Sequence, residues 1–531
     1  MVFNLQLIIT SNHEYDMPAS LLQRRVWALP LLAASMLTVF SCNAPQEQMK
    51  PSSTGFDQAR LSGDLMFYAL TDGNQLLQLS SGAPSTPMAT ISVTGLMPGD
   101  RLVSIDFRPA TGQLYAVSSM SRMYTINPMT GAARAIGTAP MTPAIDGDGV
   151  GLDFNPTVDR IRLVTNKGQD LRLNPETGAV QAVDGVINGA PGAAISGVAY
   201  TNNFAGATTT TLFTIDPVND KLYRQDPPNN GTQVEIGPLG VDIIGLSGFD
   251  ISPAGEAIAA LGRTGSGSEL YEINLSTGQA TKVGNLPNMS IIGLAIPTAP
   301  VAYAVDGLNR LMIFNPLNPG TPIVKMLTGL QSGEMLVGID FRPANGQLYA
   351  ISNRSQLYTI NTSNGAATAL GSPISPMLTS VDVGFDFNPT VDRIRVVTST
   401  GQNLRLNPDN GALVAVDGNL SPGMPNATAT AYTNNFAGAT TTVMYNLDSG
   451  SDMLVRQDPP NAGVQVNVGP LGWNIEGANG FDIGGTSNTA YALLRAGVVS
   501  GVYRINLMTG AATPVVSFPA PVQAMAVGLG F

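Results

Sequence analysis

The sequence has a single cysteine, Cys42, and a single histidine, His13, among 531 residues. No disulfide bond can therefore form within one chain, and a zinc site built from cysteine and histidine ligands is excluded. If the residues before Cys42 are removed, no histidine remains, so catalysis by Ser-His-Asp or Cys-His groups is excluded as well. These absences favour a role without enzymatic activity.

Charged residues are also scarce. They form 12% of the chain, and the formal net charge is −11, whereas soluble proteins have about 25% charged residues. Nucleic-acid binding needs a basic face that neutralises phosphates, and the sequence has no cluster of lysine and arginine to supply one. We therefore expect no nucleic-acid partner and no attraction to an anionic membrane surface. The 44% share of hydrophobic residues excludes a disordered polyelectrolyte.

The N-terminal region has the pattern of an export signal. Two arginines precede an apolar run over residues 26–40, which is as long as a signal-peptide core and short for a membrane span. The run ends in Val-Phe-Ser-Cys, which resembles a bacterial lipobox and would make Cys42 the lipid-modified first residue of the mature protein. We expect a signal peptide over residues 1–41 and a flexible tether over residues 42–57. The alternatives are an ordinary signal with an incidental cysteine, or a buried cysteine.

This leader predicts an exported protein. It would be a lipoprotein of the cell envelope or an extracellular protein, and it would contact the membrane only through a lipid anchor at Cys42.

Long phrases occur twice along the chain. DFNPTVDRIRLVT begins at Asp153, DFNPTVDRIRVVT begins at Asp386, and YTNNFAGATTT likewise occurs in both halves. Other phrases repeat at nearly the same distance. The chain is therefore a tandem duplication, and we expect one domain over residues 58–297 and a second over residues 298–531.

Shorter units recur inside each half. Each contains an alternating strand that ends in Asn or Asn-Pro, a turn through Thr-Gly and a second alternating strand, as in RMYTINPMTGAARAIG from Arg122. Asn, Pro and Gly are turn residues, so this is the pattern of a β-hairpin. Two more strands precede each hairpin, and four strands in about 40–50 residues are the signature of a propeller blade. We find five units in each half and expect an all-β, β-propeller fold.

Two closures of the propeller fit the sequence. Residues 291–297 resemble an innermost strand, and residues 65–94 supply three strands that could complete its blade; the chain ends in another such strand, VQAMAVGLGF. Pairing of strands from distant parts of the chain closes a propeller and removes exposed sheet edges. We expect two tandem five-bladed rings. The alternative is one ten-bladed ring, which the lack of a linker near residues 298–301 favours.

The repeated phrases resemble those of a bacterial family of exported proteins described only as a domain of unknown function. The family pattern contains runs such as DFRPATGQLYA, DFNPTVDRIR, GQNLRLNP and YTNNFAGATTT, and both halves of the chain match it. The resemblance covers residues 58–297 and 298–531, and it implies an exported protein with a β-propeller-like fold. It implies no activity, no cofactor and no catalytic residue.

One acidic position recurs on the innermost strands, in the motif Gly/Ser-x-Asp-Phe/Ile. The aspartates are Asp106, Asp153 and Asp250 in the first half and Asp340, Asp386 and Asp482 in the second. Because innermost strands line the axis, each set could form a ring of carboxylates that binds a ligand or Ca²⁺, or that acts on a glycosidic bond. The favoured interpretation is structural: each aspartate accepts backbone N–H groups between blades. At the equivalent positions of the remaining units we place Tyr200 and Ala295, and Tyr432 and Ala526.

A charged lip is a second candidate site. In NPTVDRIR, Asp159 and Arg160, or Asp392 and Arg393 in the second copy, could present their charges to a ligand. We favour a structural interpretation, in which Asp159 caps a tight turn while Arg162 or Arg172 forms an ion pair across strands.

The third candidate is the phrase YTNNFAGATTT, in which Phe204 or Tyr200 could stack on a sugar, although a hairpin connection is favoured. The sequence thus favours a non-catalytic binding or surface protein with an extracellular protein or glycan as partner. The alternative is a hydrolase or lyase that acts on polysaccharide through the aspartates. We expect no cofactor other than Ca²⁺ at the aspartates, and the sequence identifies no catalytic residue.

Overall fold

The computed structural model describes residue 61 and residues 63–531, apart from residues 266, 478 and 498. The predicted signal peptide, Cys42 and the predicted tether lie outside the described residues. The described part forms ten antiparallel sheets of four strands each, so the all-β prediction is confirmed. Its two helices are short 3-10 turns at Pro228–Asn230 and Pro460–Ala462. Neither has the length or the apolar character that a membrane-crossing helix needs.

Five sheets come from the first half of the chain. Four of them use consecutive strands, and the fifth combines β20 with β1–β3. The strands are β1 Met66–Thr71, β2 Gln75–Ser80, β3 Ala89–Ser92, β4 Leu102–Phe107, β5 Leu114–Ser118, β6 Met123–Ile126, β7 Ala133–Ile136, β8 Val150–Asn155, β9 Arg160–Thr165, β10 Asp170–Leu173, β11 Val180–Val183, β12 Gly197–Tyr200, β13 Leu212–Asp216, β14 Lys221–Gln225, β15 Gln233–Pro238, β16 Ser247–Ile251, β17 Ala257–Arg263, β18 Gly267–Ile273, β19 Ala280–Asn285 and β20 Ile291–Ala295.

The other five sheets come from the second half, and here β40 joins β21–β23. The strands are β21 Ala302–Val305, β22 Arg310–Phe314, β23 Ile323–Met326, β24 Leu336–Phe341, β25 Leu348–Ser352, β26 Leu357–Ile360, β27 Ala367–Leu370, β28 Val383–Asn388, β29 Arg393–Thr398, β30 Asn403–Leu406, β31 Leu413–Val416, β32 Ala427–Tyr432, β33 Met444–Asp448, β34 Met453–Gln457, β35 Gln465–Pro470, β36 Gly480–Ile483, β37 Ala490–Ala496, β38 Val499–Ile505, β39 Ala512–Phe518 and β40 Ala524–Val527.

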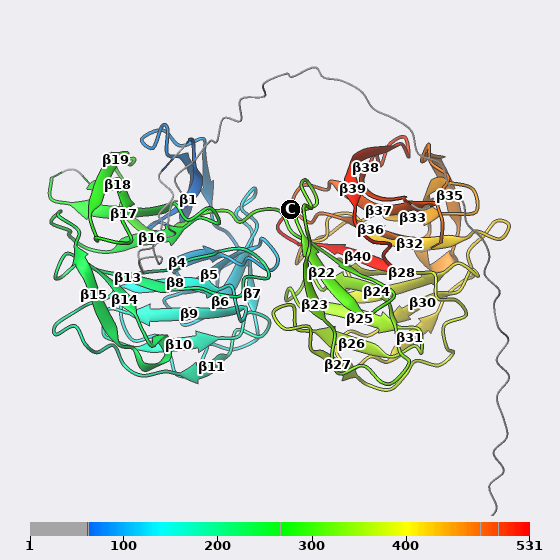
Figure 1. Ribbon diagram of the computed structural model, residues 1–531, viewed down its shortest axis with the longest axis horizontal. Coiled ribbons are helices and arrows are strands. Elements are labelled where there is room, and N and C mark those ends of the chain that lie inside the picture. The colour runs from blue at the N-terminus through cyan, green and yellow to red at the C-terminus, as the bar shows by residue number, and fades with distance from the viewer. Residues whose placement is uncertain (1–60, 62, 266, 478, 498) are drawn as a thin grey trace, which may run out of the picture. The chain divides into compact units, whose positions relative to one another are not determined.

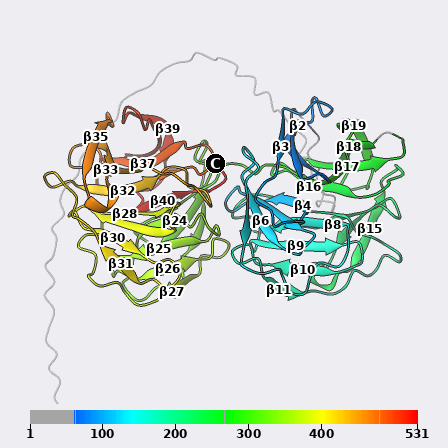
Figure 2. The same cartoon turned by 180° about the vertical axis from the view of Figure 1, so that it is seen from behind.

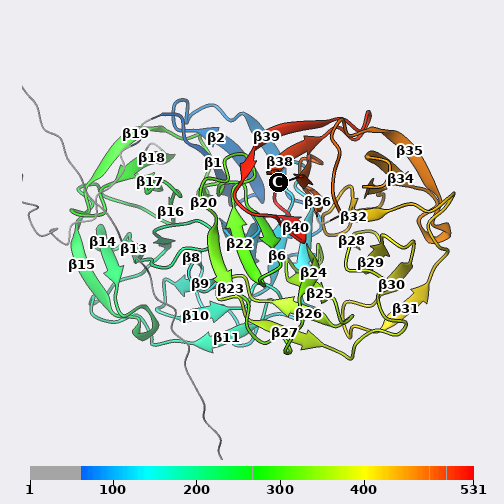
Figure 3. The same cartoon turned by 45° about the vertical axis from the view of Figure 1, so that its right-hand side comes forward.

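The innermost strands of each half contact one another in a cyclic order. In the first half the order is β4, β8, β12, β16 and β20, and β20 contacts β4 again. In the second half β24, β28, β32, β36 and β40 follow the same rule, and β40 contacts β24; Figure 3 shows these five strands around a common centre. The outermost strands, such as β11 and β27, lie at the periphery of their half in Figure 1 and Figure 2. The fold is therefore propeller-like.

The predicted hairpin chemistry explains the outer part of each sheet. In the turn from Asn127 to Gly131, the Asn127 carboxamide oxygen accepts the N–H groups of Met129 and Thr130 at 2.9 and 3.1 Å. Gly131 has a φ of 74°, a conformation that glycine adopts without steric cost. The same Asn-to-Gly geometry recurs at residues 174–178 and 506–510. These phrases therefore end one strand and begin the next.

The glycine of the Gly-x-Asp motif allows neighbouring innermost strands to approach closely. A Cβ atom added to Gly248 would lie 2.6 Å from the backbone nitrogen of Leu294, and one added to Gly480 would lie 2.4 Å from Cβ of Met525. Contacts this short exclude any larger residue without movement of the strands. The motif therefore sets the spacing around the centre of each half.

The hydrophobic core is divided into clusters that lie between neighbouring sheets. One of them packs β5 of one sheet against β8 of the next, where the rings of Tyr115 and Phe154 meet edge to face at 5.1 Å. The second half repeats this contact between Tyr349 and Phe387 at the same distance. Burial of these large rings joins each sheet to its neighbour.

Candidate functional site

The structure brings the six predicted aspartates together in two sets of three. We call Asp106, Asp153 and Asp250 the first trio, and Asp340, Asp386 and Asp482 the second trio. Within each trio, one carboxylate oxygen from every aspartate lies within 4.8 Å of the others. All six residues lie on innermost strands and are only 1% exposed. The trios are therefore closed to solvent rather than open to a ligand in a channel.

The carboxylates of the first trio accept hydrogen bonds from five backbone N–H groups that lie around the centre of the first half. These five N–H groups belong to Phe107, Phe154, Tyr200, Ile251 and Ile296, one from each sheet. Asp106 accepts two of them, Asp250 accepts two, and Asp153 accepts one, at distances of 2.6–3.1 Å. Each aspartate bonds to the following sheet of the cycle. The trio therefore gives each of these buried N–H groups an acceptor and links neighbouring sheets by hydrogen bonds.

The second trio repeats this arrangement. Its five donors are the N–H groups of Phe341, Phe387, Tyr432, Ile483 and Val527. Asp340 and Asp482 accept two each, and Asp386 accepts one. In both halves, three carboxylates thus accept the five backbone N–H groups that the five sheets present.

One assignment made from the sequence is wrong. Tyr200 was placed at the position equivalent to the aspartates, but it donates its backbone N–H to Asp153, as Phe154 does to Asp106. Tyr200 is therefore equivalent to Phe154, and its neighbour Ala199 occupies the aspartate position. The same correction moves the second-half assignment from Tyr432 to Ala431, because Tyr432 donates to Asp386.

One carboxylate oxygen in each trio remains without a partner. Six oxygens meet five donors, and the oxygens left over are Asp153 Oδ2 and Asp386 Oδ2, which are buried and accept no hydrogen bond. Burial raises the pKa of Asp153 well above its usual value, and the nearby Asp106 and Asp250 add to this rise. Burial also raises the pKa of Asp250 to about 7, although two backbone N–H groups oppose the shift. Ionised carboxylates are costly in such a place unless a positive charge or a proton balances them.

Arg162 of the repeated phrase DFNPTVDRIR lies on β9 and joins two neighbouring sheets by hydrogen bonds. We call Arg162 with its hydrogen-bond partners a latch. Arg162 is 2% exposed, and its guanidinium donates to Asp170, Asp184 and Asn229 at 2.5–2.7 Å and to the Tyr200 hydroxyl at 3.4 Å. These partners come from three separate phrases of the repeat.

Arg395 forms the same latch in the second half. It donates to Asp417, Asn461 and the Tyr432 hydroxyl, and also to Asn403, which stands where the first half has Asp170. The phrases recur because each half needs the same latch.

The predicted charged lip is also part of a latch. The Asp159 carboxylate binds the guanidinium of Arg108 from the preceding sheet at 2.5 and 2.9 Å. The turn is capped by Asn155 instead, whose side chain accepts the N–H of Thr157 at 3.0 Å. The turn cap predicted for Asp159 is therefore wrong, whereas the ion pairs predicted for Arg162 and Arg172 exist, because both arginines bind Asp184.

The predicted sugar-stacking residues differ in exposure. Tyr200 is 1% exposed, so its ring cannot stack on a ligand, whereas Phe204 is 37% exposed. Asn203, which directly precedes Phe204 in this phrase, is a residue that the sequence does not single out. Asn203 and its equivalent Asn435 are fully buried, and neither side chain has a hydrogen-bond partner.

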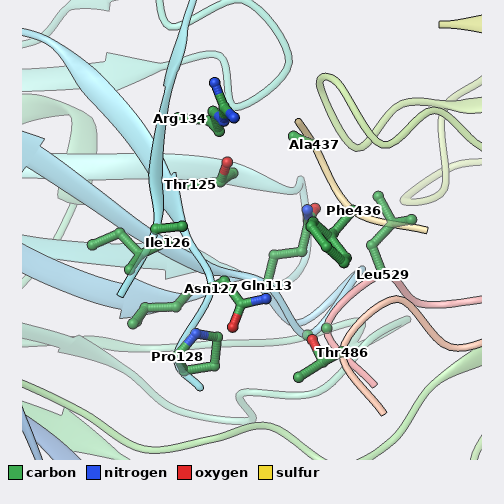
Figure 4. A pocket seen from close by; sticks show the side chains of 14 residues that line it. Gln113, Thr125, Ile126, Asn127, Pro128, Arg134, Phe436, Ala437, Thr486 and Leu529 are labelled. Carbon is green, nitrogen blue, oxygen red and sulfur yellow. The ribbon is translucent and has the colours of Figure 1, made fainter. Parts of the chain in front are cut away.

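Each half has an open cleft beside its latch. The cleft of the second half measures about 240 Å³ and that of the first half about 260 Å³. Polar and charged residues that line them include Arg393, Arg405 and Asn461 in the second half and Asn155, Arg224 and Asp226 in the first. These volumes suit a group smaller than the drug-sized ligands that fill pockets of about 300–1,000 Å³. A further pocket of about 40 Å³, with Gln113, Arg134 and Phe436 in its wall, has room for water alone (Figure 4).

Comparisons with known proteins place the chain in a family. A family model described as "Domain of unknown function (DUF4394)" matches residues 75–295 and again residues 310–528. A comparison with curated proteins finds no match. A solved structure titled "Structure of Dos1 propeller" is similar at 10% identity over 63% of this chain and 92% of that chain, with a TM-score of 0.26. A similarity this low supports no conclusion about function.

Proposed function

Since the chain belongs to the family described as a domain of unknown function (DUF4394) and contains two tandem copies of it, we propose that each copy forms a separate five-bladed β-propeller and that the protein has a non-catalytic binding or surface role. Strand pairing supports the separate closure. β20 pairs with β1, and β40 pairs with β21, so each half completes its last sheet with its own strands. A single ten-bladed ring would instead pair β40 with β1.

The burial of both trios is the observation that carries the non-catalytic proposal. A glycosidase needs two carboxyl groups that reach the scissile bond from opposite sides. The six aspartates are 1% exposed, and backbone N–H groups occupy their oxygens, apart from one oxygen in each trio. The arrangement is also the same in both halves, whereas catalysis would require unlike acids with separate tasks. The trios therefore suit a scaffold.

The two clefts are the surfaces that we propose for binding. Arg395 lines the cleft of the second half, and Tyr200, the hydroxyl partner of Arg162, lines the cleft of the first half. Arginine, asparagine and proline side chains line both clefts. Such a lining suits the hydroxyl or carboxylate groups of an extracellular glycan, or polar side chains of a protein. Because the clefts occur in both copies, one chain would present two sites and bind a multivalent partner more tightly than either cleft alone.

Export and lipid attachment complete the proposal. The apolar run over residues 26–40 and the Val-Phe-Ser-Cys sequence support a signal peptide and a lipid anchor at Cys42. We expect the protein in the cell envelope or outside the cell. Growth of an expressing bacterium with labelled palmitate should label the protein, and Cys42→Ser should abolish the label. A label that survives in Cys42→Ser would contradict the anchor.

The binding role is tested against a polysaccharide-degrading activity with two variants. The full-length protein, an Asp153→Asn/Asp386→Asn variant and an Arg224→Ser/Arg393→Ser variant, which removes one arginine from each cleft, are applied to an array of bacterial and plant glycans. Binding and the release of reducing ends are measured. We expect no release from any sample, and weaker binding by the arginine variant alone. Release that disappears in the aspartate variant would overturn the proposal in favour of a hydrolase or lyase.

A further inference from the structure

We propose that each trio of aspartates binds one calcium ion, so that the protein holds two ions at the centres of its two halves. The proposal is independent of the binding role of the clefts, because the trios are buried and the clefts are open.

The first argument is the charge of the trios. Among the described residues, no lysine or arginine forms an ion pair with any of the six aspartates. Arg162 lies opposite Asp153 on the neighbouring strand, but its guanidinium binds Asp170 and Asp184 instead. Three carboxylates that are 1% exposed therefore share one place without a side chain of opposite charge. A bound cation would supply the missing charge.

The second argument is the free oxygen. Every other carboxylate oxygen of the first trio accepts a backbone N–H, whereas Asp153 Oδ2 is buried and has no donor. The second trio leaves the equivalent atom, Asp386 Oδ2, in the same state. A buried acceptor without a partner is costly, and the duplication has kept it twice at one position. A cation can be coordinated by this free oxygen without breaking any of the five hydrogen bonds from backbone N–H groups.

The third argument is the size of the site. Three oxygens that lie within 4.8 Å of one another fit a circle of radius 4.8/√3, so a cation at its centre is at most about 2.8 Å from each, near the calcium–oxygen distance of about 2.3–2.6 Å. All protein ligands are hard oxygens, which excludes metals that prefer sulfur or imidazole. Mg²⁺ gives up its water reluctantly, and a site closed to solvent leaves little room for a hydrated ion. Calcium fits best.

The experiment counts calcium in proteins that have passed through the unfolded state, because closed sites exchange slowly. The full-length protein is unfolded, freed of metal with EGTA while unfolded, refolded in millimolar calcium, freed of excess ion and analysed by mass spectrometry for metal per chain. A second portion is refolded in EGTA for comparison. Asp153→Asn and Asp386→Asn are the test variants. Their amide oxygen can still accept the N–H of Tyr200 or Tyr432, so the ring of donors is kept. Asp170→Asn is the matched control, because the second half carries Asn403 at that position.

The proposal predicts a graded result. The wild type and Asp170→Asn should hold two ions, each single trio variant one, and Asp153→Asn/Asp386→Asn none. Calcium should raise the Tm of the wild type by roughly 5 °C or more and leave that of the double variant unchanged. Absence of calcium from the refolded wild type, or equal calcium content in the double variant, would overturn the proposal. Circular dichroism checks that every variant has refolded, and equal Tm values of wild type with calcium and with EGTA would also count against it.

Discussion

The two kinds of aspartate in a trio should respond differently to the same substitution. In the second trio, Asp482 accepts two N–H groups, from Ile483 and Val527, both at 2.6 Å. Asparagine has one acceptor oxygen, so Asp482→Asn leaves one buried N–H facing an amide NH₂. An unpaired buried donor costs about 1–3 kcal/mol. Asp386 accepts only the N–H of Tyr432, which asparagine can still accept.

We therefore expect Asp482→Asn to lower the free energy of unfolding by about 2 kcal/mol more than Asp386→Asn does. In a unit of 150–250 residues this corresponds to a Tm difference of roughly 4–8 °C. Asp386→Asn itself should be neutral or stabilising when calcium is absent, because it replaces one of three neighbouring buried carboxyl groups with a neutral amide.

The assay is equilibrium unfolding in urea with EGTA, followed by tryptophan fluorescence. Trp27 precedes Gly55, so in a chain that begins at Gly55 the only tryptophan is Trp473, which packs on Tyr503 in the second half. The signal therefore reports the half that carries the substitutions. The same variants made as Asp250→Asn and Asp153→Asn in the first half serve as controls that leave the Trp473 transition in place. An Asp386→Asn protein that is as unstable as Asp482→Asn, or less stable, would refute the count of donors and acceptors.

Three other predictions follow from the same contacts. In EGTA the Tm should fall as the pH rises from about 4 to about 7. The reason is that burial raises the pKa of Asp250 and Asp482 from 3.8 to about 7, so over this range the folded protein keeps protons that the unfolded chain releases. A Tm that rises over this range would contradict this prediction. Gly480→Ala should cost about 1–3 kcal/mol through its clash with Met525, whereas Gly307→Ala, which meets nothing closer than 3.6 Å, should be nearly neutral. Arg395→Met should cost about 3–5 kcal/mol because it leaves the Asp417 carboxylate, whose side chain is 7% exposed, without one of its two arginine partners. An equal effect of Arg405→Met, whose side chain is 30% exposed, would show that burial of the arginine does not set the cost.

Much of this fold could be predicted from the sequence because each sheet has the same local signals. Alternating strands, Asn-Pro turns and Thr-Gly pairs have physical meanings that do not depend on distant residues. The repeated Asp positions could be found in the same way, since Asp106, Asp153 and Asp250 share one motif. The pairing of β20 with β1 could be proposed because one strand lacked partners at each end of a half.

The missed features depend on contacts between sheets. Tyr200 was misplaced because Ala199, which carries no polar group, gives no sign of its equivalence to the aspartates; only the N–H bond to Asp153 reveals it. The count of five donors against six oxygens requires the side-chain geometry of all five sheets at once. The partner of Asp159 is Arg108, 51 residues away in the chain, and no local pattern connects them. The buried side chain of Asn203 gives no signal beyond the repetition of its phrase.

Unfolding of the second half alone is the most direct test of the claim that each half closes on itself. Residues 298–531 contain all four strands of every one of their five sheets. We predict that this fragment folds and that its Trp473 fluorescence reports one cooperative urea transition with a midpoint close to that of the whole protein. A fragment without a cooperative transition, in which Trp473 fluoresces as in the unfolded chain, would contradict the claim.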